Sequence, residues 1–373
     1  MTLIDDLEPV FLVDTPLIDT RSPVEYAKGS LPNAVNLPLM NDAEREAVGT
    51  CYRHQGAESA ARLGHDLVSG QNRANRIAQW QHFAIAHPGG ALFCFRGGLR
   101  SEISQQWLLE AGTAYPRIEG GYKRMRRWLN EQTENLLQSM PLLLLGGQTG
   151  VAKTRVLNEG NGGDPIPGSV DLEGFANHRG SAFGRRASEQ PTQISFELAL
   201  AVAFFRCGKT DTSRLLLEDE GHLIGRCALP QALQGARQTA DWVQLEASTE
   251  ERVQHSYENY ILGNLRDLEA LHSDPELAFE SFASGLEDSL ERIKKRLGGE
   301  RHEALRQQLS AALASHRKGR PEGHQSWIER LLIDYYDPMY AYQMSKREKP
   351  PIFRGNEQEV ADYLSHESSL ARH

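Results

Sequence analysis

Short apolar runs alternate with helical stretches through the first part of the chain. The runs at 17–19, 35–38 and 91–93 predict strands. Residues 124–138 predict the helix that closes this region, and 118–122 predicts its last edge strand or a loop. This alternation is typical of a parallel α/β sheet covered by helices.

Pro141 interrupts the pattern, and a new apolar run begins directly after it at 142–145. A helix that reaches this proline ends there, because proline has no backbone N–H to donate. We therefore predict two α/β domains, residues 1–139 and 140–373, with almost no linker between them. The 373 residues are enough for each domain to bury a core of its own.

Long amphipathic helices dominate the last third of the chain. Segments 275–296 and 302–316 place apolar residues at three- and four-residue spacing. Segment 327–344 continues this pattern with an expected interruption at Pro338. The second domain should therefore carry a helical C-terminal extension over about 265–373.

One cysteine stands in a setting typical of an anion-binding loop. Segment 93–101 reads FCFRGGLRS, so Cys94 ends an apolar strand and a predicted helix begins near Ser101. Glycines let backbone N–H groups turn inward, and a helix N-terminus adds positive potential, which together bind a tetrahedral anion and favour a thiolate. The predicted anion-binding residues are Arg96, Gly97, Gly98 and Arg100.

Two chemistries fit this loop. A strand-end cysteine is more often a small buried hydrophobe, but the glycine pair and two arginines favour a reactive Cys94. The spacing also fits a cysteinyl-phosphate mechanism, although Phe93 stands where many tyrosine phosphatases carry histidine. We favour a nucleophile that carries sulfur or selenium as a persulfide or perselenide.

A second phosphate-binding signature follows at 147–154, which reads GQTGVAKT. It matches Gly-x4-Gly-Lys-[Ser/Thr] except at Ala152, where we expect a negative φ that alanine tolerates. Lys153 would contact terminal phosphates, and the hydroxyl of Thr154 suits Mg²⁺. The predicted diphosphate-binding residues are Gly147, Thr149, Gly150, Lys153 and Thr154.

A carboxylate partner for the metal is expected on a later strand, and segments 170–174 and 215–220 compete for that role. The expected Mg²⁺ ligands are Thr154 with Asp171 or Asp219. Segment 177–184 is basic and glycine-punctuated, as a substrate or phosphate lid would be. An acidic turn at 218–220 and an ordinary loop histidine are the alternatives. The candidates for this second part of the site are Asp171, Glu173, His178, Arg179, Asp219 and Glu220.

The formal net charge of −9 counts against a nucleic-acid partner, yet segment 122–128 reads YKRMRRW. This cluster is either a solvated helix face or a stripe that binds an RNA backbone. The tRNA-binding candidates are Lys123, Arg124, Arg126 and Arg127.

Other global features narrow the class of protein. The longest apolar run, 142–145, is far too short to span a bilayer, and the N-terminus has no basic region before an apolar one. We therefore expect a cytoplasmic protein without a membrane partner. Cys51, Cys207 and Cys227 form no C-x-x-C pair with one another or with Cys94, so we expect neither disulfides nor a thiolate zinc site.

Segments 19–26 (DTRSPVEY) and 29–38 (GSLPNAVNLP), taken with the Cys94 loop, resemble a rhodanese domain. Ser30 and Asn33 depart from the usual histidine and glycine of that signature. Five residues separate Cys94 from Arg100, one more than in common sulfur-transferring rhodaneses and the same as in dual-specificity phosphatases. The wider loop suits a phosphate-sized anion.

The whole chain is similar to the bacterial tRNA 2-selenouridine synthase family. The resemblance runs from about residue 17 to 347 and rests on four motifs. These motifs are 94–101, 171–181 (DLEGFANHRGS), 218–220 (EDE) and 335–340 (YYDPMY). It implies a rhodanese-like parallel-sheet domain followed by a P-loop NTPase-like α/β domain with a helical C-terminal region.

The resemblance also implies the reaction. Sulfur at C2 of wobble 2-thiouridine would be replaced by selenium in the tRNAs for lysine, glutamate and glutamine. Selenophosphate would be the selenium donor, and geranyl diphosphate would give an S-geranyl intermediate at the P-loop. An apolar groove for the ten-carbon chain should lie beside that loop, with Mg²⁺ as the expected cofactor and no organic prosthetic group.

Other classes of function stay open at this stage. A P-loop kinase or ATPase could use the first domain only to recruit a partner, and a dual-specificity-type phosphatase could do the same with the second. A tRNA-binding or phosphate-sensing module without catalysis is a further alternative. The sequence does not decide which oligomer forms.

Overall fold

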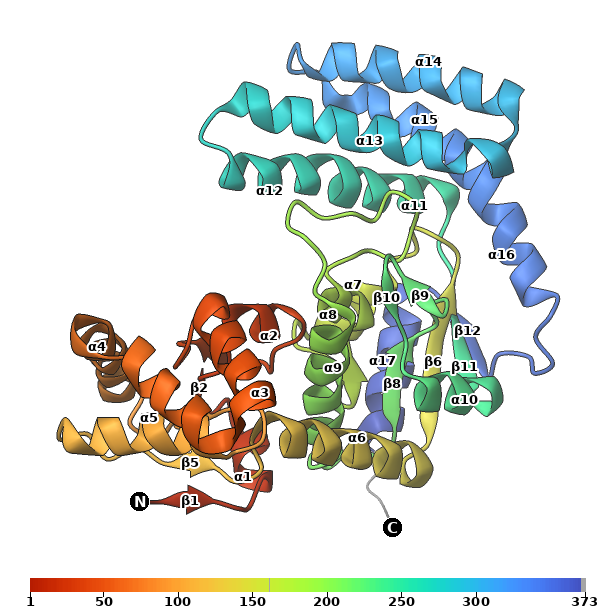
Figure 1. Ribbon diagram of the computed structural model, residues 1–373. Helices are drawn as coiled ribbons and strands as arrows, with labels where there is room; N and C mark the ends of the chain where they lie inside the picture. Colours follow the sequence, from red (N-terminus) through yellow and green to blue (C-terminus); the bar gives the residue numbers. More distant parts are fainter. Residues whose placement is uncertain (161, 370–373) are drawn as a thin grey trace. The chain divides into compact units, whose positions relative to one another are not determined.

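The computed structural model describes residues 1–160 and 162–369. These residues form two compact units, described separately here (Figure 1). The first contains Met1–Leu136 and Thr192–Arg206, and the second contains Leu137–Pro191 and the chain from Cys207 onward. A helix from the second half of the sequence thus belongs to the first unit, an exchange that a single boundary at 139/140 does not anticipate.

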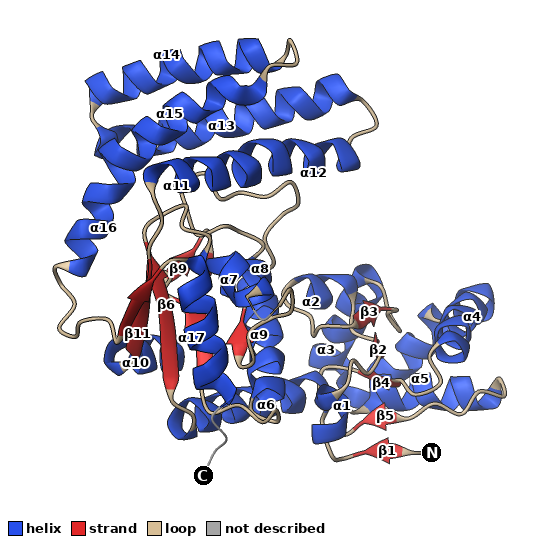
Figure 2. Ribbon diagram, turned by 180° about the vertical axis from the view of Figure 1, so that it is seen from behind, coloured by secondary structure: helices blue, strands red, loops and turns tan. Residues whose placement is uncertain are grey.

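The first unit is built on a parallel sheet in the order β1-β5-β4-β2-β3 (Figure 2). The expected alternation of strands and helices is therefore present, but 118–122 is not an edge strand. β5 lies between β1 and β4, because residues 3–4 pair outside it. The strands are β1 (Leu3–Ile4), β2 (Leu17–Asp19), β3 (Ala34–Asn36), β4 (Ala91–Phe93) and β5 (Arg117–Ile118).

Helices cover both faces of this sheet. Successive strand residues point to opposite faces, and the residues on each face are buried in a different cluster. Leu17 and Phe93 belong to one buried cluster, whereas their neighbours Ile18 and Leu92 belong to another. The first cluster also takes in Leu198 and neighbouring residues of the exchanged helix. The helices are α1 (Glu8–Leu12), α2 (Pro23–Ala27), α3 (Asp42–Leu67), α4 (Gly70–Ala86), α5 (Leu99–Glu110), α6 (Gly121–Ser139) and α9 (Gln193–Cys207).

The second unit contains another parallel sheet, in the order β12-β11-β6-β8-β7. Leu145 of β6 pairs with Glu218 of β8, so the carboxyl ends of these two central strands lie side by side. This edge is where open α/β sheets bind their ligands. The strands are β6 (Leu142–Gly147), β7 (Ser169–Val170), β8 (Leu215–Glu218), β11 (Asp241–Leu245) and β12 (Phe353–Gly355), with a hairpin of β9 (Leu223–Ile224) and β10 (Cys227–Ala228).

Helices pack on this sheet, and a separate layer of helices lies beyond the carboxyl ends of its strands (Figures 1 and 2). Those on the sheet are α7 (Lys153–Glu159), α8 (Leu172–Ala176), α10 (Gln231–Thr239) and α17 (Glu357–Ser369). The layer consists of α11 (Thr249–Ser256), α12 (Asn264–Leu271), α13 (Pro275–Leu297), α14 (Gly299–His316), α15 (His324–Leu331) and α16 (Asp337–Met344). Among the described residues, no helix combines the length and apolar character needed to cross a membrane.

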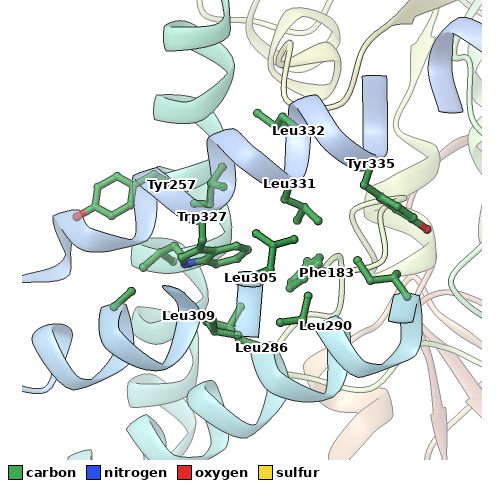
Figure 3. Close-up of a cluster of buried hydrophobic side chains, with 14 of the residues drawn as sticks. Phe183, Tyr257, Leu286, Leu290, Leu305, Leu309, Trp327, Leu331, Leu332 and Tyr335 are labelled. Atoms are coloured by element: carbon green, nitrogen blue, oxygen red, sulfur yellow. The ribbon is translucent and has the colours of Figure 1, made fainter. Parts of the chain in front are cut away.

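The helical layer has a core of its own, and Phe183 enters that core from the loop after α8 (Figure 3). Its ring lies 5.5 Å from that of Trp327, centroid to centroid. The basic loop at 177–184 is therefore anchored by packing in the helical layer. Pro338 does not interrupt the helix predicted at 327–344: a π-helical turn at Leu332–Tyr336 leads into α16, and proline fits the first turn of α16.

Candidate functional site

The phosphate-binding loop lies between β6 and α7, at the carboxyl edge of the second sheet. Gly150 has a φ of +89°, and a Cβ there would stand 2.8 Å from Ser256 Oγ and 3.0 Å from the carbonyl oxygen of Arg252. Only glycine fits at this position. Loop residues and α11 are thus in direct contact.

Ala152 corrects one expectation about this loop. Its φ is +69° and its ψ is +34°, a left-handed conformation and not the negative φ that the sequence suggested. Left-handed backbone brings the Cβ of an L-residue too close to the following carbonyl oxygen. The loop therefore keeps the shape that glycine would favour, with alanine under strain.

Three glutamates, one buried and two half-buried, surround the cation of Lys153 and the hydroxyl of Thr154. The Thr154 hydroxyl lies 3.1 Å from Glu173 Oε2 and also contacts Glu218. The Nζ atom of Lys153 lies 3.7 Å from Glu220 Oε1. Four side chains from α7, α8 and the end of β8 thereby converge with Thr154 at one point.

This crowding shifts the pKa of Lys153 and of the three glutamates. Burial raises the pKa of Glu218 to about 8, with help from Asp171 and Glu220, and burial also raises the pKa of Glu173 and Glu220. Burial works to lower the pKa of Lys153, but the glutamates outweigh it and raise that pKa. The site is an electrostatic well for cations.

Asp171 and Asp219 have other partners. Asp171 caps α8, because its side chain accepts a hydrogen bond from the Gly174 N–H at 2.7 Å. It also accepts one from the side-chain amide of Asn158 at 2.9 Å. Asp219 pairs with Arg237 at 3.0 Å and with Arg347. The carboxylates beside Thr154 are those of Glu173 and Glu218, and the sequence prediction of metal ligands omitted Glu218.

Across the described ranges, no group of three or more His, Cys, Asp or Glu side chains is placed to hold a metal ion. The donors next to Thr154 are nevertheless all oxygens, which hard cations such as Mg²⁺ prefer. The hydroxyl with the two glutamates fits that ion in donor type.

The loop at 177–184 folds over the same glutamates. A Cβ on Gly180 would stand 2.4 Å from Glu220 Oε2 and 2.5 Å from Glu173 Oε1, so its backbone lies against both carboxylates. Two tyrosines of the helical layer hold this loop in place. Tyr260 donates to the Arg179 carbonyl at 3.4 Å, and Tyr336 accepts from the Ala182 N–H at 3.2 Å.

His178 is buried in this loop and does not line the cavity described below. Its pKa is lowered to about 4 by burial and by the neighbouring arginines. The side chain is therefore neutral near pH 7, and it supports the loop as an uncharged residue.

Arg252 joins the phosphate-binding loop to the helical layer, a link that the sequence did not suggest. Its Nε donates to the Thr149 carbonyl at 2.9 Å, and its guanidinium pairs with Asp337 at 2.5 Å. The segment 335–340 thus contacts the 177–184 loop through Tyr336. It also supports the P-loop, because Asp337 pairs with Arg252. A buried arginine on a polar helix has no distinctive local sequence signal.

These elements enclose a cavity of about 890 Å³. Gly147 and the loop through Thr154 form one wall, and the 179–181 segment forms another. Apolar and aromatic side chains of α16, its preceding turn and the β9 hairpin complete it. They are Leu223, Tyr336, Met339, Tyr340 and Met344.

Cys94 lies at the end of β4 in the first unit and is 3% exposed. Its Sγ is 3.2 Å from the Ser101 hydroxyl and 3.8 Å from the Gly98 carbonyl oxygen. The turn before α6 closes on this loop, because a Cβ on Gly121 would stand 2.2 Å from the Cys94 carbonyl oxygen. The Tyr122 N–H then donates to that oxygen at 2.9 Å.

The two arginines of this loop differ. Arg96 is exposed and forms no ion pair within the described part of the chain. Arg100 pairs with Glu25 at 2.5 Å. Burial works to raise the pKa of Glu25, but hydrogen bonds and the charge of Arg100 lower it to about 2. To contact an anion, Arg100 must therefore break its ion pair with Glu25 or bind the anion with the part of its guanidinium that Glu25 leaves free.

Family models match both parts of the chain. Residues 140–371 match the tRNA 2-selenouridine synthase AAA domain, and residues 3–126 match the rhodanese-like domain. A protein of Hahella chejuensis named tRNA 2-selenouridine synthase is 52% identical over 98% of this chain and 95% of its own length. The chain belongs to the tRNA 2-selenouridine synthase family.

Further relatives with that name agree. One from Pseudomonas fluorescens is 48% identical over 97% of this chain and 98% of its own length, and one from Bordetella petrii is 46% identical over 97% and 96%. The expected family and the expected fold class, a rhodanese domain followed by a P-loop domain, are confirmed. The assigned roles of single residues stay predictions.

The basic cluster on α6 is mostly paired with acids. Arg124 lies 3.3 Å from Glu119, and Arg127 lies 3.6 Å from Glu131. Arg126 is 3.5 Å from Glu197 of α9. Lys123 is exposed. These pairs favour a solvated helix face, and tRNA binding by this cluster stays a prediction.

Proposed function

We propose that this protein replaces the sulfur of wobble 2-thiouridine in tRNA with selenium. Geranyl diphosphate first alkylates the sulfur at the P-loop, and selenophosphate then supplies selenium at Cys94. The acceptors are the tRNAs for lysine, glutamate and glutamine. The observation that carries this proposal is the presence of two chemically different anion loops in two units of a tRNA 2-selenouridine synthase family member.

The cavity of the second unit suits transfer from a prenyl diphosphate. Its loop amides and Lys153 can hold the diphosphate, and Met339 and Met344 offer apolar surface to the prenyl chain. The thiouridine sulfur would attack C1 of the geranyl group, forming a C–S bond as diphosphate leaves. Stabilising that leaving group lowers the barrier.

A divalent cation fits this scheme. Thr154 with Glu173 and Glu218 would hold Mg²⁺, which would neutralise charge on the departing diphosphate. The proton that the raised pKa of Glu218 retains near pH 7 would be released when the cation binds.

The first unit suits chemistry at a phosphorus or chalcogen centre. Attack of the Cys94 sulfur on the phosphorus of selenophosphate would form an S–P bond and release HSe⁻. The loop amides and Arg96 would hold the phosphoryl oxygens, and the Ser101 hydroxyl can donate to the sulfur. Selenide then displaces geranyl thiol from C2, and water hydrolyses the S–P bond, which releases phosphate and regenerates the Cys94 thiolate. Storage of the selenium as a perselenide would require a two-electron oxidant as well.

Mass analysis of nucleosides tests this function. Purified protein is incubated with 2-thiouridine tRNA and each donor, separately and together. We expect S-geranyl-2-thiouridine with geranyl diphosphate alone, 2-selenouridine with both donors, and no change with selenophosphate alone. Unchanged nucleosides together with ATP hydrolysis would instead support a kinase or ATPase.

Lys153→Ala tests the role of the P-loop. Loss of a charge-assisted hydrogen bond to diphosphate costs about 1.5–3 kcal/mol, so the geranylation rate at low donor concentration should fall roughly 10- to 100-fold. Lys294→Ala on α13 is the matched control, since Lys294 is exposed and, among the described residues, its ion pair is with Glu291 one turn away. Normal geranylation by Lys153→Ala would contradict the role assigned to this lysine.

A further inference from the structure

Four arginines gather around His178 in the second unit. Arg179, Arg185 and Arg186 belong to its own loop, and Arg292 comes from α13. All four act on His178 through their positive charge. Arg185 also forms a β-bridge with His178, which fixes it beside that residue. The backbone therefore holds Arg185 next to His178. Arg179 and Arg186 are half-buried, and the side chains of Arg185 and Arg292 reach solvent.

No carboxylate neutralises this cluster through an ion pair in the described part of the chain. Arg179 donates to the amide oxygen of Asn264. Arg292 donates to the Ala182 carbonyl at 3.0 Å and to the Ser289 hydroxyl at 2.7 Å. The Nε atom of Arg186 is buried without a hydrogen-bond partner.

Burial and charge repulsion within the cluster both lower the pKa of its arginines. Burial lowers the pKa of Arg179, and Arg186 lowers it further. Burial and then Arg185 do the same for Arg292. Asp267 and Asp288 act on these two arginines only through space, without an ion pair. Positive charges that lie close together and repel one another are typical of a site that binds an anion, because the anion offsets the repulsion.

The cluster opens into the cavity of the P-loop. Arg179 and Arg186 line that cavity, and Arg266 of α12 and Arg296 of α13 line it as well. Aromatic rings of Tyr260, Tyr336 and Tyr340 line the same space. Tyr260 and Tyr340 are half-buried and Tyr336 is buried. Cations that line a groove together with aromatic rings are typical of sites that bind single-stranded nucleic acids through phosphates and stacked bases.

We propose that this arginine cluster, with Arg266 and Arg296, binds the phosphodiester backbone of the substrate RNA where a nucleotide enters the P-loop cavity. The inference rests on the proposed function and names the part of the site that holds the RNA. The α6 cluster, whose arginines are already paired with acids, is not needed for this contact.

The distribution of charge favours RNA over a second diphosphate. The P-loop already provides backbone N–H groups and Lys153 for one diphosphate. The six arginines come from a loop and two helices, so they suit a chain of separate phosphates. Turning a base out of an anticodon loop costs little, because that base is already single-stranded.

Binding of unmodified tRNA at several salt concentrations tests the proposal. In Arg185→Glu/Arg186→Glu we expect about tenfold weaker binding or more near 0.1 M salt, and a slope of log K against log salt that is smaller in magnitude by about 2. Arg185→Lys/Arg186→Lys should keep most of the wild-type salt slope, since lysine retains the positive charge that contacts phosphate. Arg306→Glu/Lys318→Glu, on exposed positions outside the cavity, is the charge-matched control.

A thermal melt of each variant and its binding of geranyl diphosphate complete the experiment. Weakened geranyl diphosphate binding with normal tRNA binding would assign the cluster to the donor and overturn the proposal. An unchanged salt slope in the charge-reversed variant, or an equal loss in the control, would overturn it too. Failure of the proposed function is seen separately, because the wild-type protein would then give no modified nucleoside.

Discussion

At the scale of single residues, Ala152 shows a loop geometry imposed against local preference. Its left-handed backbone costs an L-residue about 1–2 kcal/mol relative to glycine. Glycine recovers that strain but adds about 0.4–1 kcal/mol of entropy to the unfolded chain. Relief of the strain raises the free energy of unfolding, whereas the added entropy of the unfolded chain lowers it. The strain is the larger of the two effects.

Ala152→Gly should therefore raise the free energy of unfolding by up to about 1 kcal/mol or leave it unchanged. Ala311→Gly is the control, because Ala311 is exposed in the interior of α14, where glycine costs about 1 kcal/mol. Urea denaturation of both variants measures the difference. A loss at position 152 as large as that at 311 would show that the left-handed conformation carries no strain.

Neighbouring carboxylates show where residue-level prediction stops. Glu218 and Asp219 are adjacent acids after an apolar run, and the sequence supports either as a partner of Thr154. The structure separates them, because Glu218 ends β8 beside Leu145 and Asp219 turns to Arg237. That choice depends on arginines from distant segments, which no local pattern reveals. Lys153 and Thr154, by contrast, are fixed by the loop motif itself.

At the scale of elements, a histidine pair stabilises the turn between α14 and α15. His324 is fully buried, and its Nδ1 accepts a hydrogen bond from the Trp327 indole N–H at 2.9 Å. Its Nε2 therefore carries the proton and donates to His316 Nδ1 at 3.2 Å. The arrangement requires neutral His324, and burial and the charge of His316 lower its pKa to about 4.

This pKa predicts acid sensitivity of the helical layer. A histidine with a pKa of 6.5 when unfolded and about 4 when folded stabilises the fold fully above pH 6.5 and loses that contribution as the pH falls toward 4. The loss is on the order of 3 kcal/mol. His324→Phe should unfold with a correspondingly shallower pH dependence, which urea denaturation at pH 7 and pH 4.5 measures.

His178 titrates in the same direction, so the wild-type protein should lose more stability than His324 alone explains. His54→Phe, at an exposed site in α3, is the control and should follow the wild-type curve. Parallel curves for His324→Phe and the wild type would mean that His324 is already solvated in the folded protein.

Elements with a strong local signal are the ones that sequence predicts well. Helices α13 and α14 agree with the predicted 275–296 and 302–316 within a few residues, because their apolar spacing is regular. The position of β5 inside its sheet and the placement of α9 in the first unit are decided by pairing between distant segments. Periodicity carries no information about such partners.

At the scale of the whole molecule, the Cys94 loop (94–101) and the P-loop (147–154) belong to different compact units with separate cores. Each loop is shaped by contacts within its own unit: Gly121 closes on Cys94, and Arg252 holds Thr149. A substitution confined to one loop should therefore leave the other loop's shape intact. The two chemical steps become separable by mutation.

Cys94→Ser should abolish formation of 2-selenouridine while geranylation of 2-thiouridine tRNA continues at close to the wild-type rate. A serine hydroxyl is a far weaker nucleophile near pH 7, yet it can keep the contacts to Ser101 and Gly98, so the loop should stay folded. Nucleoside mass analysis with both donors should then show S-geranyl-2-thiouridine accumulating. Cys51→Ser is the control, since Cys51 lies in α3 outside the loop, and it should form 2-selenouridine normally. Loss of both products in Cys94→Ser would mean that the Cys94 loop is also required for alkylation. The assignment of one chemical step to each unit would then be wrong.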